Sequence, residues 1–92
     1  MTTQSKAENT PHRQPIQELL ANGAALLRDA GVENPRREAR LLLQHALGLT
    51  PEALLALSVR DCVAVEPFQA WVVRRARHEP FAYITGSKGF WN

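Results

Sequence analysis

The sequence predicts an all-α domain, a small bundle of four to five helices, and three observations support this prediction. Leucines recur at helical spacing along most of the chain, capping residues followed by proline mark where helices begin, and glycines follow where they end. The chain has 92 residues, of which 45% are hydrophobic, which is enough for one core and too little for two. We therefore expect a single helical domain.

The apolar pattern divides the chain into three segments. Residues 1–14 are polar and carry mixed charge, so ordering them would cost entropy with little gain, and we expect a disordered tail. Residues 15–86 hold the leucine pattern and form the predicted helical domain. Residues 87–92, SKGFWN, look like the first strand of a longer element, and we expect the start of a β-hairpin that leads to a further domain.

Two long helices are expected first. The first helix should cover residues 15–30, because apolar residues fall on one side of it and Gly31 supplies a stop. Asn34 before Pro35 marks the next start, since Asn can cap free N–H groups and proline costs nothing at the first helical position. The second helix should cover residues 35–47. The apolar stripes of the two helices are Ile16, Leu19, Leu20, Gly23, Leu26, Leu27 and Ala30, and then Ala39, Leu42, Leu43, Ala46 and Leu47.

Three shorter segments follow. Thr50 and Pro51 repeat the start signal for a short helix that ends at residue 57 or 58. Residues 59–65 suit either a loop or a brief extended stretch, and we favour a loop. A fourth helix should run from residue 66 to 78, and Pro80 should begin a fifth that ends at Gly86. The inner face of the fourth helix would hold Phe68, Trp71, Val72 and Ala76.

The chain lacks the motifs of several functional classes. It has no Gly-rich phosphate-binding loop, so we expect no nucleotide or methionine-derived cofactor to bind here. Its three histidines have no carboxylate or cysteine companions at ligand spacing, so we expect no metal site. The single cysteine, Cys62, excludes an internal disulfide, and we expect a buried or inert thiol in a cytoplasmic protein. No stretch approaches the roughly 18 apolar residues of a membrane span.

The arginines of the second and fourth helices are the candidates for partner binding. The net charge is only +2, but helical geometry turns Arg37, Arg40, Arg74 and Arg77 away from the apolar stripes, toward an acidic or phosphate-bearing partner. An ordinary solvated surface is the alternative for these four residues. Leu41 lies on the same outer face, where it either contacts a neighbouring segment or contributes to a docking surface.

Two further arginines are expected to be structural. Arg36 and Arg75 border or enter the core side of their helices. A guanidinium on an inner face needs a partner, and Glu38 on the second helix is the predicted partner of Arg75.

Two segments carry a resemblance to a known family: NPRREARLLLQHALGL at residues 34–49 and RRARHEPFAYITGSKGFW at residues 74–91. They resemble the patterns P-R-x-[DE]-A-x-x-L-L and R-R-x-x-G-E-P-x-x-Y-I-x-G-x-x-x-F-W of the PrmC/HemK release-factor glutamine methyltransferases. Within these patterns we assign structural roles to Arg36, Glu38, Arg75, Pro80, Tyr83 and Gly86. The chain departs from the family at His78, where glycine is usual, and at Gly89, where an acidic residue is frequent.

The resemblance implies a division of labour within a larger enzyme. It implies a helical bundle joined through a β-hairpin to a Rossmann-like methyltransferase domain, which holds S-adenosylmethionine and an N-P-P-Y motif. That enzyme would methylate the glutamine side-chain amide in the G-G-Q loop of peptide-chain release factors. The chain would end before the catalytic domain, hold no cofactor itself, and serve as the domain that recognises the release factor.

Two alternatives remain open at this stage. A helical module that binds nucleic acid or the ribosome would use the same arginines on phosphates, although a net charge of +2 argues against it. A purely structural cap on the methyltransferase domain would use Phe90 and Trp91 as part of its interface.

Overall fold

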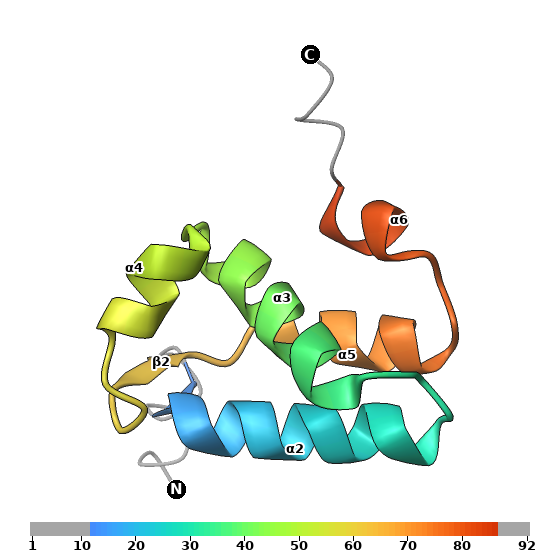
Figure 1. Ribbon diagram of the computed structural model, residues 1–92, viewed down its shortest axis with the longest axis horizontal. Coiled ribbons are helices and arrows are strands. Elements are labelled where there is room, and N and C mark those ends of the chain that lie inside the picture. Colours follow the sequence, from blue (N-terminus) through green and yellow to red (C-terminus); the bar gives the residue numbers. More distant parts are fainter. Residues whose placement is uncertain (1–11, 87–92) are drawn as a thin grey trace, which may run out of the picture.

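The computed structural model describes residues 12–86 and has a mainly helical architecture (Figure 1). Within that range, five helices and two short strands follow one another. Their bounds are β1 Arg13–Pro15, α2 Ile16–Asp29, α3 Pro35–Leu47, α4 Pro51–Ala56, β2 Cys62–Ala64, α5 Phe68–Ala76 and α6 Phe81–Thr85. The predicted helical bundle is confirmed. The hairpin expected at residues 87–92 lies outside the described residues.

Helix α2 forms the base of the bundle and the other long helices pack on it. In Figure 1, α3 crosses over α2 while α5 lies beside both, and α6 stands at one side of the bundle, beyond α5. Helix α2 packs against α3 and α5, and α3 also packs against α5 and α6. The two arginine-bearing helices of the sequence prediction, α3 and α5, are therefore held by a common neighbour.

Most of the core comes from the predicted apolar stripes, and the remaining core residues are Ala24, Val32, Leu54, Val65 and Ile84. Ala39, Leu42 and Leu43 of α3 have no exposed surface, and Phe68 and Val72 of α5 are each 2% exposed. One residue of the predicted stripe on α2 does not belong to the core: Leu26 is 44% exposed. It lies at the edge of the stripe, one position before Leu27, which is fully buried.

A glycine sets the distance between α2 and α5. A Cβ atom on Gly23 would lie 2.9 Å from Cζ of Phe68 and 3.4 Å from Cγ2 of Val72. Real Cβ atoms do not approach other atoms as closely as 2.9 Å. The absence of a side chain at Gly23 therefore allows the Phe68 ring to pack directly on the α2 backbone.

Strands β1 and β2 correct two of the sequence predictions. The strands are antiparallel, with Arg13 opposite Ala64 and Pro15 opposite Cys62. Arg13 and Gln14 were expected in a disordered tail, and residues 62–64 in a loop. The pairing joins segments far apart in sequence, and neither three-residue segment shows the alternation of a longer strand.

The β2 region also caps the start of α2. The N–H groups of Ile16 and Gln17 donate to the carbonyl oxygens of Asp61 and Val59, each at 2.9 Å. The first N–H groups of a helix have no partner within the helix, and these bonds to the loop before β2 satisfy two of them. They also fix the position of Val59 against α2.

The two predicted N-caps differ. Thr50 caps α4 as expected, since its Oγ1 accepts from the Ala53 N–H at 3.0 Å. Asn34 makes no side-chain cap bond to α3, because its backbone is left-handed with φ of 53°. Asparagine tolerates that conformation better than most residues, and this tolerance is its contribution to the turn.

Candidate functional site

Arg75 and Glu38 form the pair that the sequence predicts. Nε of Arg75 donates to Oε1 of Glu38 at 2.9 Å, and each side chain is 22% exposed. The pair joins α5 to α3, because the two residues lie on different helices. Arg75 therefore acts within the bundle.

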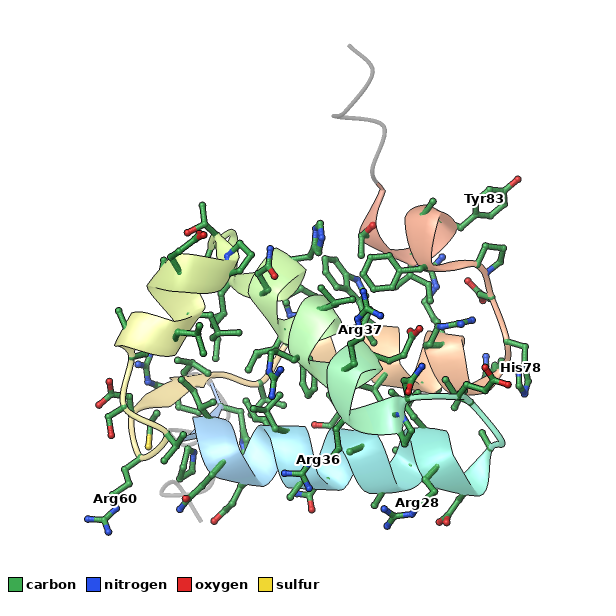
Figure 2. The ribbon with its side chains drawn as sticks, viewed as in Figure 1. Arg28, Arg36, Arg37, Arg60, His78 and Tyr83 are labelled. Carbon is green, nitrogen blue, oxygen red and sulfur yellow. The ribbon has the colours of Figure 1, made fainter. Side chains whose placement is uncertain are left out.

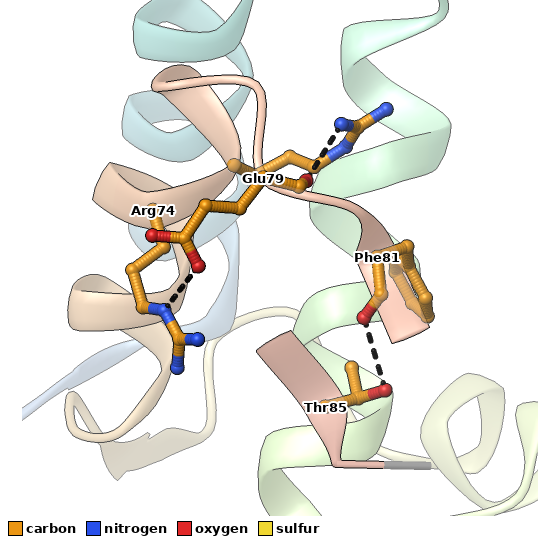
Figure 3. Close-up of polar contacts among 5 residues, drawn as sticks. Arg74, Glu79, Phe81 and Thr85 are labelled. Carbon is orange, nitrogen blue, oxygen red and sulfur yellow. Dashed lines mark hydrogen bonds and ion pairs between the residues drawn. The ribbon is translucent and has the colours of Figure 1, made fainter. Parts of the chain in front are cut away.

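The neighbouring Arg74, predicted to face a partner, also makes an ion pair within the chain. Its Nε donates to Oε1 of Glu79 at 2.8 Å, as Figure 3 shows. The carbonyl oxygen of Glu79 accepts a second bond, at 2.9 Å, from Nη1 of Arg75. Glu79 comes just after the two-residue turn that follows α5, so both arginines of α5 hold the chain beyond that turn.

The short helix α6 places Tyr83 outside the bundle. Pro80 accepts bonds from the N–H groups of Tyr83 and Ile84, and Gly86 ends α6 with a left-handed φ of 63°. Phe81 lies on the inner side, with its ring 5.5 Å from that of His45 in an edge-to-face arrangement. Tyr83 faces away, is 75% exposed and projects from α6 in Figure 2. Tyr83 was expected to have a structural role, but its side chain does not pack in the core formed by residues 12–86.

His78 occupies a backbone conformation that glycine adopts more easily than other residues. Its φ is 69°, in the left-handed region where a side chain costs energy. Its ring compensates in part, because Nε2 lies 3.0 Å from the carbonyl oxygen of Ala30 at the end of α2. Figure 2 shows His78 at the turn beside this end of α2.

A groove between α2 and α3 is the most distinctive surface feature. It has a volume of about 440 Å³. On one side, the lining residues of α2 recur at spacings of three, four and seven positions, so they lie on one face of that helix. The outer edge of α3 forms the other side. Its lining residues are Gln17, Leu20, Ala21, Ala24, Arg28, Arg36, Arg40 and Val59.

Small residues on α2 explain why the groove exists. Ala21 and Ala24 lie in the middle of its stripe, where longer side chains would fill the space between the helices. Val59, which is 54% exposed, adds an apolar group at the end of the groove that adjoins the start of α2. The floor is therefore apolar and open.

The rim of the groove carries concentrated positive charge. Arg28 comes from α2, Arg36 and Arg40 come from α3, and all three are exposed. The lining contains no aspartate or glutamate, and among residues 12–86 the only ion pairs are those of Arg74 and Arg75. These three guanidinium groups are therefore available to an anionic group from outside.

The predicted site residues do not all lie on one surface. Arg36, expected at the border of the core, is exposed and points toward α2 in Figure 2, where it lines the groove with Arg40. Arg37 and Arg77 are exposed, as helical geometry predicts, but neither lines the groove. Leu41 is half-buried.

Sequence reasoning missed Arg28 and Val59. Arg28 lies four residues after Ala24 on the face of α2 that lines the groove, and that face is not the apolar stripe predicted from the sequence. Val59 carried no local signal, because its place depends on the backbone bond from Gln17.

Other candidate chemistry is limited among the described residues. Cys62 is exposed, which rules out the buried alternative of the expected buried or inert thiol, because β2 lies at the surface and pairs with β1. Within residues 12–86, no three His, Cys, Asp or Glu side chains converge as they would around a metal ion. Over the same residues, no helix combines the length and the apolar character that a membrane span requires.

Comparison with known proteins identifies the family. Residues 18–86 match the family described as PrmC N-terminal domain. The chain is 47% identical over 75 residues to the release factor glutamine methyltransferase of Rhodospirillum rubrum, covering 79% of this chain and 23% of that protein. It is 42% identical over 79 residues to the bifunctional methyltransferase of Rickettsia bellii, covering 84% of this chain and 14% of that protein.

A third relative shows the same relationship. The release factor glutamine methyltransferase of Caulobacter vibrioides is 39% identical over 67 residues, which cover 71% of this chain and 23% of that protein. The chain thus spans less than a quarter of the length of these relatives. No solved structure matches it. The match over residues 18–86 and these identities show that the chain belongs to the PrmC N-terminal domain family.

Proposed function

We propose that this chain is the substrate-recognition domain of a release factor glutamine methyltransferase. The observation that carries the proposal is the match of residues 18–86 to the PrmC N-terminal domain, together with the names of the relatives that share it. Residues 15–86 would recognise the release factor, and residues 87–92 would begin the link to the methyltransferase domain.

The proposed reaction takes place in the rest of the enzyme. S-adenosylmethionine would supply the methyl group there, and the acceptor would be the glutamine side-chain amide in the G-G-Q loop of a release factor. The helical domain would increase the rate for the intact factor, because contacts remote from the reacting glutamine help to orient it. This domain would contribute no group to the chemical step.

The free arginines support a binding role. Arg36, Arg37 and Arg40 lie on α3, are exposed, and have no ion pair among the described residues. Arginine suits recognition of carboxylates, because its planar guanidinium can donate two parallel bonds to one carboxylate. A release factor with acidic surface segments would be attracted to this side of the domain.

The test uses two substrates in the full-length enzyme that carries this domain. One substrate is the intact release factor, and the other is a short peptide containing only the G-G-Q sequence. A double variant, Arg37→Glu with Arg40→Glu, should lower kcat/KM for the intact factor by about tenfold or more. It should leave kcat/KM for the peptide unchanged, because the peptide does not reach the helical domain.

The control is Arg60→Glu, which reverses a charge in the loop before β2. Arg60 projects from that loop, away from α3, in Figure 2. Its variant should retain the wild-type kcat/KM for both substrates. Equal losses for the factor and the peptide in the double variant would favour the structural cap and contradict the proposal, as would unchanged values for both substrates.

A further inference from the structure

We infer that the groove between α2 and α3 receives an acidic helical segment of the partner protein. Carboxylates of that segment would bind Arg28, Arg36 and Arg40, and an apolar side chain would lie over Ala21 and Ala24. The identification of the partner as a release factor rests on the proposed function. The chemistry of the groove stands on the lining residues alone.

Charge complementarity sets the class of the ligand. Three guanidinium groups line one groove of about 440 Å³, and no carboxylate lines it. Like charges held in one groove repel one another, and a bound carboxylate removes part of that repulsion. The partly enclosed setting also screens such a pair less than an open surface does.

The spacing of the arginines suits a helix. Arg36 and Arg40 lie four residues apart on α3, which is about 6 Å along the axis. Glutamates four residues apart on a partner helix repeat that distance, so two of them can face the two arginines. The α2 stripe from Gln17 to Arg28 runs for about 17 Å, which is the length of a helix of about three turns.

The apolar floor favours protein over nucleic acid. Leu20, Ala21, Ala24 and Val59 offer contacts to aliphatic side chains and none to phosphates. Proteins that bind nucleic acids usually carry a larger excess of positive charge than the +2 of this chain.

The groove is also held in place before binding. Val59 is fixed by the bond from the Gln17 N–H, and α3 is fixed by the pair of Glu38 with Arg75. A site that is already formed loses less entropy on binding than a flexible one.

The test measures binding by calorimetry with the complete 92-residue chain and two synthetic helical peptides of 14 residues. The first peptide carries glutamates four residues apart beside a leucine stripe, and the second carries glutamines in their place. The wild-type chain should bind the glutamate peptide at least about tenfold more tightly, since only the glutamates can form charge-assisted bonds with the guanidinium groups.

Three variants locate the binding site. Arg36→Glu and Arg40→Glu should each weaken glutamate-peptide binding by about tenfold or more. Ala21→Phe fills the groove without changing charge and should weaken it similarly. Arg60→Glu is the matched control and should change the affinity less than about twofold, because Arg60 is exposed and does not line the groove. All four positions are exposed, and unchanged circular dichroism would verify folding.

The outcomes separate the two proposals. Wild-type affinity for the glutamate peptide in the Arg36→Glu and Arg40→Glu variants would overturn the groove assignment. A release factor that binds equally well to these variants, while the Arg37→Glu with Arg40→Glu enzyme still loses kcat/KM for the intact factor, would overturn the groove but leave the proposed function in place. Peptide binding that maps to the groove, with no binding of a release factor, would support the groove but overturn the proposed function. Tighter binding of a 12-nucleotide oligodeoxythymidine than of the glutamate peptide would overturn the assignment to a protein ligand.

Discussion

Nε of Arg75 on α5 lies 2.9 Å from Oε1 of Glu38 on α3, and this pair sets the position of the helix that carries Arg36 and Arg40. Glu38 lies between those two arginines in sequence, with its side chain turned toward α5. The bundle and the groove thus depend on the same turn of α3.

Replacing Arg75 should destabilise the bundle strongly. Arg75→Ala leaves the Glu38 carboxylate, which is 22% exposed, without its partner, and also removes the bond to the Glu79 carbonyl. We expect a loss of about 2 kcal/mol, below the cost at fully buried pairs because solvent reaches this one. Thermal unfolding should show a fall in Tm of about 10 °C.

Arg74→Ala is the matched control, because its pair with Glu79 is more exposed, at 40% and 37%. Its cost should be about 0.5 kcal/mol. A double-mutant cycle of Arg75→Ala with Glu38→Ala should give a coupling energy of about 1–2 kcal/mol. Independent effects of the two substitutions would contradict the structural role of the pair.

Gly23→Ala should destabilise the domain although alanine favours helices. The substitution gains about 1 kcal/mol of helix propensity, but its Cβ would lie 2.9 Å from Cζ of Phe68. Overpacking costs about 1–3 kcal/mol, so we expect a net loss of stability in urea unfolding. Asn22→Ala, at an exposed position of α2, should be neutral or slightly stabilising. A Gly23→Ala protein more stable than the wild type would show that α5 can move away without cost.

Two substitutions at His78 would measure the energetic cost of its left-handed backbone conformation. His78→Gly and His78→Ala both lose the contact of the ring with the Ala30 carbonyl, so they differ mainly in the cost of a φ of 69°. The glycine variant should be more stable in thermal unfolding, by about 1 kcal/mol. Equal stability of the two variants would mean that the turn relaxes out of the left-handed region.

The cap at Thr50 should matter more than the one at Asn34. Thr50→Ala removes the bond to the Ala53 N–H and should cost about 1 kcal/mol of the free energy of unfolding. Asn34→Gly removes no side-chain cap bond and suits the left-handed backbone, so it should be neutral or stabilising. Denaturant unfolding of both variants measures the contrast, and a larger loss for Asn34→Gly would contradict it.

Much of the fold could be predicted because its determinants are local. The apolar stripe of α3 and the proline at which the helix begins both lie within one short segment of sequence. The bounds of that helix, residues 35–47, are as predicted. The pairing of Arg13 with Ala64 could not be predicted, because it depends on contact between distant segments. The left-handed backbone of Asn34 was hidden for a similar reason, since the same residue type also suits an ordinary cap.

The candidate site was predicted only in part. Helical geometry alone placed Arg40 outside the core. The pair of Arg75 with Glu38 could also be predicted, because a charged side chain on the inner face of a helix needs a partner of opposite charge. The groove itself depends on how α3 lies across α2, which brings Arg28 near Arg36. No feature of a single helix encodes that crossing.

The most direct measurement is an NMR titration of the isotopically labelled chain with an intact release factor. Binding at the groove predicts chemical-shift changes at residues 20–24, at residues 36–40 and at Val59, with little change at Arg60. Spectra that remain unchanged at saturating release factor, or changes confined to α6 around Tyr83, would contradict recognition through this surface.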